Sequence, residues 1–221
     1  MSYCNVFNFT SRGMTYALMA VLMLLSRQAL AHPHSFIDMQ TTVEGQDGYI
    51  TGLRMNWTMD AITSADLLYD AGNATKDSVV WKKLAAQVMA NVLGQHYFTD
   101  VYRNGKRVKY VAVPTEYRLS RKGNQAVLEF VLPLAHPQPL AGKPLQISTY
   151  DPTYFVDMSY KDGKAITVSP LLASHCKTTL WTPKPNLSLQ AYALSLDKRS
   201  KPVADVSLGK QFAQQVTLQC Q

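Results

Sequence analysis

Hydrophobic and polar residues alternate along two stretches near the start of the chain, residues 35–43 and 53–57. Each stretch places its apolar residues on one face, with Ile37, Met39 and Val43 in the first and Leu53, Met55 and Trp57 in the second. A period of two is typical of strands that bury one face. Asp47-Gly48 lies between the stretches and favours a turn. The pattern therefore predicts a β-hairpin.

A helical period replaces the alternation after this hairpin. The sequence predicts a first helix from about Asp60 to Ala71, ending near Gly72, and a second from about Asp77 to Leu93. Asp77 is suited to cap the second helix and Gly94 to end it. The apolar stripe of the second helix predicts a core-facing surface, and its residues are Val80, Trp81, Leu84, Ala85, Val88 and Val92.

Short predicted strands with turn residues between them follow the helices. Asn104-Gly105 is a strong hairpin signal. The expected strands are Val101–Tyr102, Val108–Val113, Tyr117–Leu119, Ala126–Leu132, Leu145–Tyr150, Tyr154–Tyr160 and Ala165–Val168. We therefore expect an α+β, mainly β fold: an antiparallel β-sandwich-like domain with an insertion of two helices at about residues 60–94. The last 35 residues show no clear pattern.

The first 31 residues have the features of a cleaved signal peptide. Arg12 precedes an apolar run at residues 16–25, and Ala29-Leu30-Ala31 supplies the small residues of a cleavage site. The run is shorter than the roughly 20 apolar residues of a membrane anchor. We expect export to the periplasm and a mature single domain at residues 32–221.

Charge and cysteine content add two expectations. Loss of Arg12 and Arg27 lowers the formal net charge from +7 to +5, and without a basic run this gives no indication of nucleic-acid binding. The mature chain keeps Cys176 and Cys220. In an oxidising compartment such a pair predicts a disulfide, which would stabilise the fold by up to about 4 kcal/mol through loop closure.

The predicted mature chain begins His32-Pro33-His34, an unusual concentration of metal-binding nitrogen. The free amine and the ring of His32 can chelate one ion together. In an extended chain His34 points the same way, about 6.6 Å along the strand. Pro33 has no amide proton, which blocks the square-planar mode that binds copper or nickel through backbone amides. The remaining modes suit zinc, copper or nickel.

A carboxylate is expected next to these histidines. If the first hairpin pairs Ile37 with Trp57, then His34 lies opposite Asp60, and a shift of two residues places His32 there instead. Opposed side chains have β-carbons about 5 Å apart, close enough to share an ion. Asp60 is equally suited to cap the following helix. Asp38 lies on the same face, but about 13 Å along the strand from His34.

Three segments together resemble a known family. They are HPHSFID (residues 32–38), WTMD (57–60) and YDPTYFVDM (150–158), following the signal-peptide pattern. The chain resembles a family of uncharacterised bacterial periplasmic proteins, domain of unknown function 1007, one branch of which is known as ZevA-type zinc-related proteins. The resemblance covers most of the mature chain.

The resemblance implies a partner and further site residues. Members are associated with membrane permeases of the nickel/cobalt exporter type, and zinc acquisition is proposed for the ZevA branch. His32, His34 and Asp60 then correspond to candidate ligands, with Asp151 and Asp157 as further candidates. Asp151-Pro152 is equally typical of a turn that ends a strand.

Three classes of function follow. The first is a non-enzymatic accessory that binds a divalent transition metal, zinc foremost and copper or nickel otherwise, for an integral-membrane permease. The second is a copper protein in which the terminal histidine supports redox chemistry. The third is a metal-free module that docks on a membrane partner. Gly-x-Ser-x-Gly, HExxH and P-loop patterns do not occur, so hydrolase and nucleotide-driven functions have no support.

Overall fold

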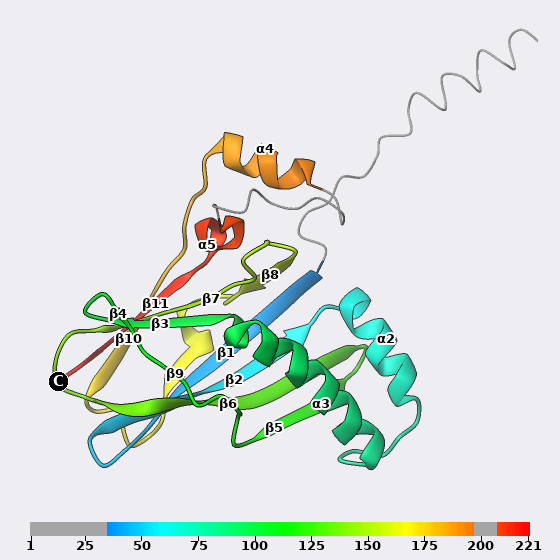
Figure 1. Cartoon of the computed structure of the whole chain (residues 1–221), viewed down its shortest axis with the longest axis horizontal. Coiled ribbons are helices and arrows are strands. Elements are labelled where there is room, and N and C mark those ends of the chain that lie inside the picture. The colour runs from blue at the N-terminus through cyan, green and yellow to red at the C-terminus, as the bar shows by residue number, and fades with distance from the viewer. Residues whose placement is uncertain (1–34, 197–206) are drawn as a thin grey trace, which may run out of the picture.

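A computed structural model describes residues 35–196 and 207–221. The predicted signal peptide, its cleavage site and the two histidines at 32 and 34 lie outside this part of the chain. Within it the fold is mainly β, as the sequence predicts, with two sheets and four α-helices, two of which were not predicted (Figure 1). None of the helices among these residues combines the length and hydropathy that a membrane crossing requires.

The first sheet is built around the predicted N-terminal hairpin. Its strands run in the order β5-β6-β2-β1-β8, and β9 pairs with β1 further along. Their bounds are β1 Ser35–Gln46, β2 Tyr49–Met59, β5 Tyr117–Lys122, β6 Gln125–Pro139, β8 Val156–Ser159 and β9 Ile166–Val168. Neighbours pair antiparallel except β8 and β9, which both run parallel to β1. The sequence did not predict this parallel pairing.

The second sheet has the order β10-β11-β7-β3-β4 and is antiparallel throughout. Its strands are β3 Thr99–Arg103, β4 Lys106–Arg107, β7 Leu145–Thr149, β10 Cys176–Trp181 and β11 Gln215–Cys220. The predicted disulfide is confirmed, because Cys176 and Cys220 are bonded at opposed positions of β10 and β11. The prediction of a strand at residues 108–113 is wrong. The strand β4 ends at Arg107, and Tyr110 forms only an isolated bridge.

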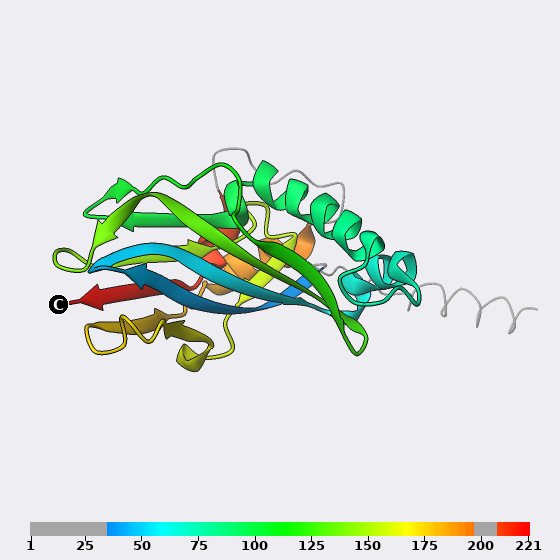
Figure 2. The ribbon, with the colours of Figure 1, turned by 90° about the horizontal axis from the view of Figure 1, so that it is seen from below.

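Helices cover one end of the first sheet. The inserted helices are α2 Ala61–Ala71 and α3 Val79–Gly94, which contact β6 and β5 (Figures 1 and 2). Asp60 caps α2 and Gly72 ends it, as expected. Ser78 precedes α3 in place of Asp77, whose φ of 61° takes it out of the helical region. The C-terminal segment adds α4 Leu187–Ser195 and α5 Leu208–Phe212, while short 3₁₀ turns lie at His96–Phe98 and Gly163–Ala165.

One hydrophobic core joins the two sheets and α3. Its largest fully buried side chains come from both sheets and from the inserted helix, and include Trp57, Phe130, Met55, Met89, Leu132 and Ile147. Trp57 packs edge-on against Phe130, with ring centroids 4.8 Å apart. Tyr154 and Phe212 belong to a smaller satellite cluster with α4 and α5. The sandwich-like arrangement predicted from the alternation is therefore present.

The register of the first hairpin differs from the predicted one by two residues. Ile37 pairs with Met59 rather than Trp57. The reason lies at the turn, where Asp47-Gly48 forms a two-residue loop with positive φ at both positions. A bulge next to Gly45 then adds one residue to β2, which restores the match between apolar faces. In this register Asp60 follows Met59, the partner of Ile37, and therefore lies opposite Phe36.

Candidate functional site

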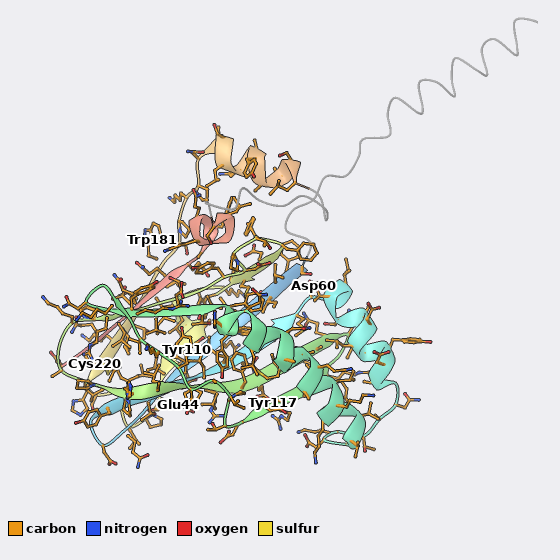
Figure 3. The ribbon with its side chains drawn as sticks, viewed as in Figure 1. Glu44, Asp60, Tyr110, Tyr117, Trp181 and Cys220 are labelled. Atoms are coloured by element: carbon orange, nitrogen blue, oxygen red, sulfur yellow. A yellow bond between two sulfur atoms is a disulfide. The ribbon has the colours of Figure 1, made fainter. Side chains whose placement is uncertain are left out.

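The candidate site lies where β1 begins, at the end of the first sheet that carries α2. Figure 3 labels Asp60 there, at the junction of β2 and α2. β1 is the strand to which the predicted histidine-rich N-terminus connects directly, since Ser35 follows His34 in the chain. Three aspartates are candidate metal ligands, and their carboxylates have different surroundings. They are Asp60, Asp151 and Asp157.

The Asp60 carboxylate is fully engaged in fixing the backbone. Oδ1 accepts the amides of Ile62 at 2.8 Å and Thr63 at 2.9 Å, the expected N-cap contacts of α2. Oδ2 accepts the amide of Phe36 at 2.8 Å and the hydroxyl of Thr63. Its own amide donates to the Phe36 carbonyl at 3.0 Å. Asp60 therefore ties the start of β1 to the start of α2.

These contacts also set the charge state of Asp60. Desolvation raises its pKa, but the hydrogen bonds from Thr63, Phe36 and Ile62 outweigh it, so the pKa lies below its ordinary value. The ionised form accepts hydrogen bonds better than the neutral one. Asp60 thus remains a carboxylate down to acidic pH.

Asp151 closes a turn within the YDPTYFVDM segment. Its Oδ1 accepts the amide and hydroxyl of Thr153, each at 2.9 Å, and its Oδ2 accepts the amide of Val156 at 3.1 Å. The residue is buried, and the backbone of Gly209 on α5 packs directly against its carbonyl oxygen. This geometry matches the turn that the sequence offered as the alternative to a ligand role.

Asp157 differs from both, because its carboxylate accepts no hydrogen bond from the described residues. It lies on β8 opposite Phe36 of β1 in the parallel pairing, and so shares the outer face with Phe36 and Asp38. Burial and the negative charge of Asp38 both raise its pKa above the ordinary value. An ionised Asp157 is therefore costly in the folded chain, and a nearby cation would relieve that cost.

The negative charge of Asp157 also affects a neighbouring tyrosine, Tyr154. Tyr154 stacks on Phe212 of α5, with ring centroids 4.1 Å apart. Burial and the neighbouring Asp157 raise its pKa to about 12. The surroundings of Asp157 therefore disfavour negative charge on two side chains at once.

The structure describes the candidate aspartates but not the two candidate histidines. Within residues 35–196 and 207–221, no three His, Cys, Asp or Glu side chains gather closely enough to hold a metal ion. His32 and His34 lie outside those residues. Spacing along β1 placed Asp38 too far from His34 for a common site, and no pattern in the sequence indicated that β8 would bring Asp157 close to Asp38. Only the parallel β1–β8 pairing reveals it.

Comparison with known proteins defines the family. The model of the family described as "Protein of unknown function (DUF1007)" matches residues 17–220. An uncharacterised protein of Haemophilus influenzae is 39% identical over 208 residues, which cover 94% of this chain and 99% of that protein. The chain therefore belongs to the DUF1007 family of proteins of unknown function. No solved structure matches it.

Proposed function

We propose that the protein is an exported, periplasmic metal-binding accessory that presents a divalent transition-metal ion, zinc foremost, to an integral-membrane metal permease. Export rests on the signal-peptide pattern and on the His-Pro-His sequence that cleavage after Ala31 would free. The permease, of the nickel/cobalt exporter type or similar, and the zinc-related ZevA branch rest on the resemblance. The metal site itself is argued from the start of β1.

The observation that carries the proposal is the position of Asp157. His34 directly precedes Ser35, and consecutive Cα atoms lie about 3.8 Å apart. Asp157 is paired with Phe36, the residue after Ser35, and adjacent strands lie about 4.8 Å apart. The Asp157 carboxylate therefore lies close to Ser35, the residue that follows His34 in the chain, and it lacks a hydrogen-bond donor among the described residues.

The resulting donor set suits zinc. The amine and ring of His32, the ring of His34 and one oxygen of Asp157 would supply four ligands, the number that tetrahedral zinc takes. Asp38 adds a second negative charge next to Asp157 without being needed as a ligand. We rank Asp60 and Asp151 below Asp157 as ligands, because the hydrogen bonds described above already occupy their oxygens.

Calorimetric metal titration of the processed protein tests this site. Zinc is titrated into the chain that starts at His32 and into three changed forms: one extra serine ahead of His32, His34→Ala, and Asp157→Asn. Changing a residue that only orients a metal ligand typically weakens metal affinity by roughly 10- to 100-fold. We expect each of the three changes to weaken zinc binding by at least this much. The control is Asp66→Asn, at an exposed position of α2. Unchanged affinity with the added serine would exclude the terminal chelate.

The same preparations separate the other two classes of function. Native mass spectrometry of protein purified from the periplasm reads both the true N-terminus and the ion carried. Copper as the bound ion, together with copper-dependent peroxide turnover, would favour a redox protein. Full thermal stability and undiminished permease binding after exhaustive chelation would favour a metal-free docking module.

A further inference from the structure

A basic groove lies at the end of the sandwich formed by the β3–β4 hairpin. It has a volume of about 560 Å³. Cationic and polar side chains dominate its lining, which consists of Arg103, Asn104, Lys106, Arg107, Val108, Lys109, His136, Gln138 and Lys143. No aspartate or glutamate contributes to the lining. The groove is therefore a concentration of positive charge on a chain that is only mildly basic overall.

Arg103 is held in the groove by backbone oxygens instead of a carboxylate. Its guanidinium donates to the carbonyls of Lys143 at 2.9 Å, Pro139 at 2.7 Å and Ala141 at 2.9 Å. These bonds fix the loop after β6 against the β3–β4 hairpin. Carbonyls orient the guanidinium without neutralising it, and Arg103 forms no ion pair with any described residue. A fixed positive charge therefore remains for a ligand.

The surrounding lysines are also uncompensated. Lys106, Lys109 and Lys143 are exposed and make no ion pair within the part of the chain that the structure describes. Arg107 alone is paired, with Asp100 at 2.5 Å. Four cations of one groove thus lack a counter-charge. Such a local excess attracts anions and steers their approach.

The composition of the groove indicates the kind of anion. Protein–protein interfaces are enriched in aromatic and apolar anchors and depleted in lysine. Here lysines predominate, the lining has no phenylalanine, tyrosine or tryptophan, and its one aliphatic residue, Val108, is buried. Lysine is a flexible point charge well suited to phosphate. We propose that this groove docks the protein on an anionic lipid surface through the phosphate groups of the lipid head groups.

The groove is separate from the candidate metal site. The β3–β4 hairpin and α2 lie at opposite ends of the sandwich in both views (Figures 1 and 2). Asp60 is labelled at the α2 end (Figure 3). Lipid docking can therefore be tested without metal, and neither result depends on the other.

Vesicle co-sedimentation tests the proposal on the full mature chain. The vesicles contain phosphatidylglycerol and phosphatidylcholine, or phosphatidylcholine alone. Each lysine near an anionic surface contributes about 1 kcal/mol, so a Lys106→Gln, Lys109→Gln, Lys143→Gln variant should bind roughly 100-fold more weakly. The control variant Lys83→Gln, Lys122→Gln, Lys177→Gln removes the same charge at exposed positions elsewhere. It should bind like the unchanged protein.

Three results would overturn the proposal. They are equal binding by the two triple variants, equal binding to neutral vesicles, and no binding of the unchanged protein to anionic vesicles at low salt. A competition arm separates lipid from free phosphate: inorganic pyrophosphate bound tightly by a protein that ignores vesicles would assign the groove to a soluble ligand. Capture of an acidic peptide without vesicle binding would assign it to a protein partner. Circular dichroism spectra of both variants would check that they are folded.

Discussion

Asp157 on β8 and Asp38 on β1 lie on one face of adjacent parallel strands, near enough for the charge of Asp38 to raise the pKa of Asp157. Burial acts in the same direction and is the larger cause. A raised carboxyl pKa means that ionising Asp157 is harder in the folded chain than in the unfolded one. Two carboxylates are thus kept together at a cost in stability, and the proposed metal site rests on this relationship.

Asp157→Asn should therefore stabilise the metal-free protein at neutral pH. The gain should be on the order of 1 kcal/mol, the scale of a charge pair between adjacent strands, because asparagine carries no charge to be buried next to Asp38. Because the pKa of Asp157 is raised in the folded chain, its ionisation lowers the stability of the unchanged protein only above the ordinary carboxyl pKa of about 4. The difference between the two proteins should vanish below that pH. Urea unfolding in chelator across the acid range measures it, and a destabilised Asn variant at neutral pH would contradict it.

Asp60→Ala should destabilise the fold, since it removes the cap of α2 and the acceptor for the Phe36 amide. Loss of an N-cap costs about 0.5–2 kcal/mol. The folded pKa of Asp60 is lowered, so its contribution is present above the unfolded pKa and is lost as pH falls through the folded value. Chemical unfolding at neutral and acidic pH should show the two proteins converging in acid. Asp66→Ala, on the exposed side of α2, provides the comparison.

Alkaline pH should weaken the fold through its tyrosines. Burial, assisted by Asp157, raises the pKa of Tyr154 to about 12. Burial and the hydrogen bond to Asp100 also raise the pKa of Tyr150. Raised tyrosine pKa values stabilise the fold below about pH 10, where the unfolded side chain titrates, and this contribution is lost as pH rises further. Urea midpoints should therefore fall above about pH 10.

Tyr154→Phe isolates one part of that alkaline effect. The decline in midpoint should become shallower, because phenylalanine has no hydroxyl to ionise. Tyr69→Phe replaces a tyrosine that is 87% exposed and should leave the profile unchanged. Identical profiles for all three proteins would show that ionisation of Tyr154 does not limit alkaline stability.

Gly209→Ala should release α5 from the YDPTYFVDM segment. A β-carbon at Gly209 would overlap the backbone oxygen of Asp151, and the Gly209 amide donates to the Pro152 carbonyl at 3.1 Å. Overpacking of this kind typically costs about 1–3 kcal/mol. The loss is read as a lower urea midpoint. Gly163→Ala, where a β-carbon meets nothing within 4 Å, should be tolerated.

The sequence predicted those features of the fold that depend on neighbouring residues in the chain. Alternation and turn residues predicted the first hairpin, and the helical period predicted α2 and α3. The expectation of export, together with the two remaining cysteines, predicted the Cys176–Cys220 disulfide. Asp60 was recognised as a cap because the signal lies within three residues. The register of β1 against β2 was wrong, since a one-residue bulge next to Gly45 has no clear signature in residue types.

Contacts between distant segments could not be predicted. β8 lies more than 100 residues after β1 in the chain, and nothing in either sequence indicates that they pair in parallel. The neighbourhood of Asp157 therefore needed the structure. The groove around Arg103 was overlooked although four of its five Arg and Lys residues lie within residues 103–109. What the sequence does not indicate is that the loop carrying Lys143 folds against this hairpin and holds Arg103 by its carbonyls.

The place of β11 in the second sheet has a consequence for biogenesis. This strand comes last in the chain, yet it lies between β10 and β7 in the sheet. The sheet cannot be completed until residues 215–220 have been synthesised and released, so a growing chain would expose two unpaired strand edges. Such edges are templates for aggregation. A polypeptide truncated before Gln215 should accordingly be a substrate for chaperones and proteases rather than a slightly shorter protein.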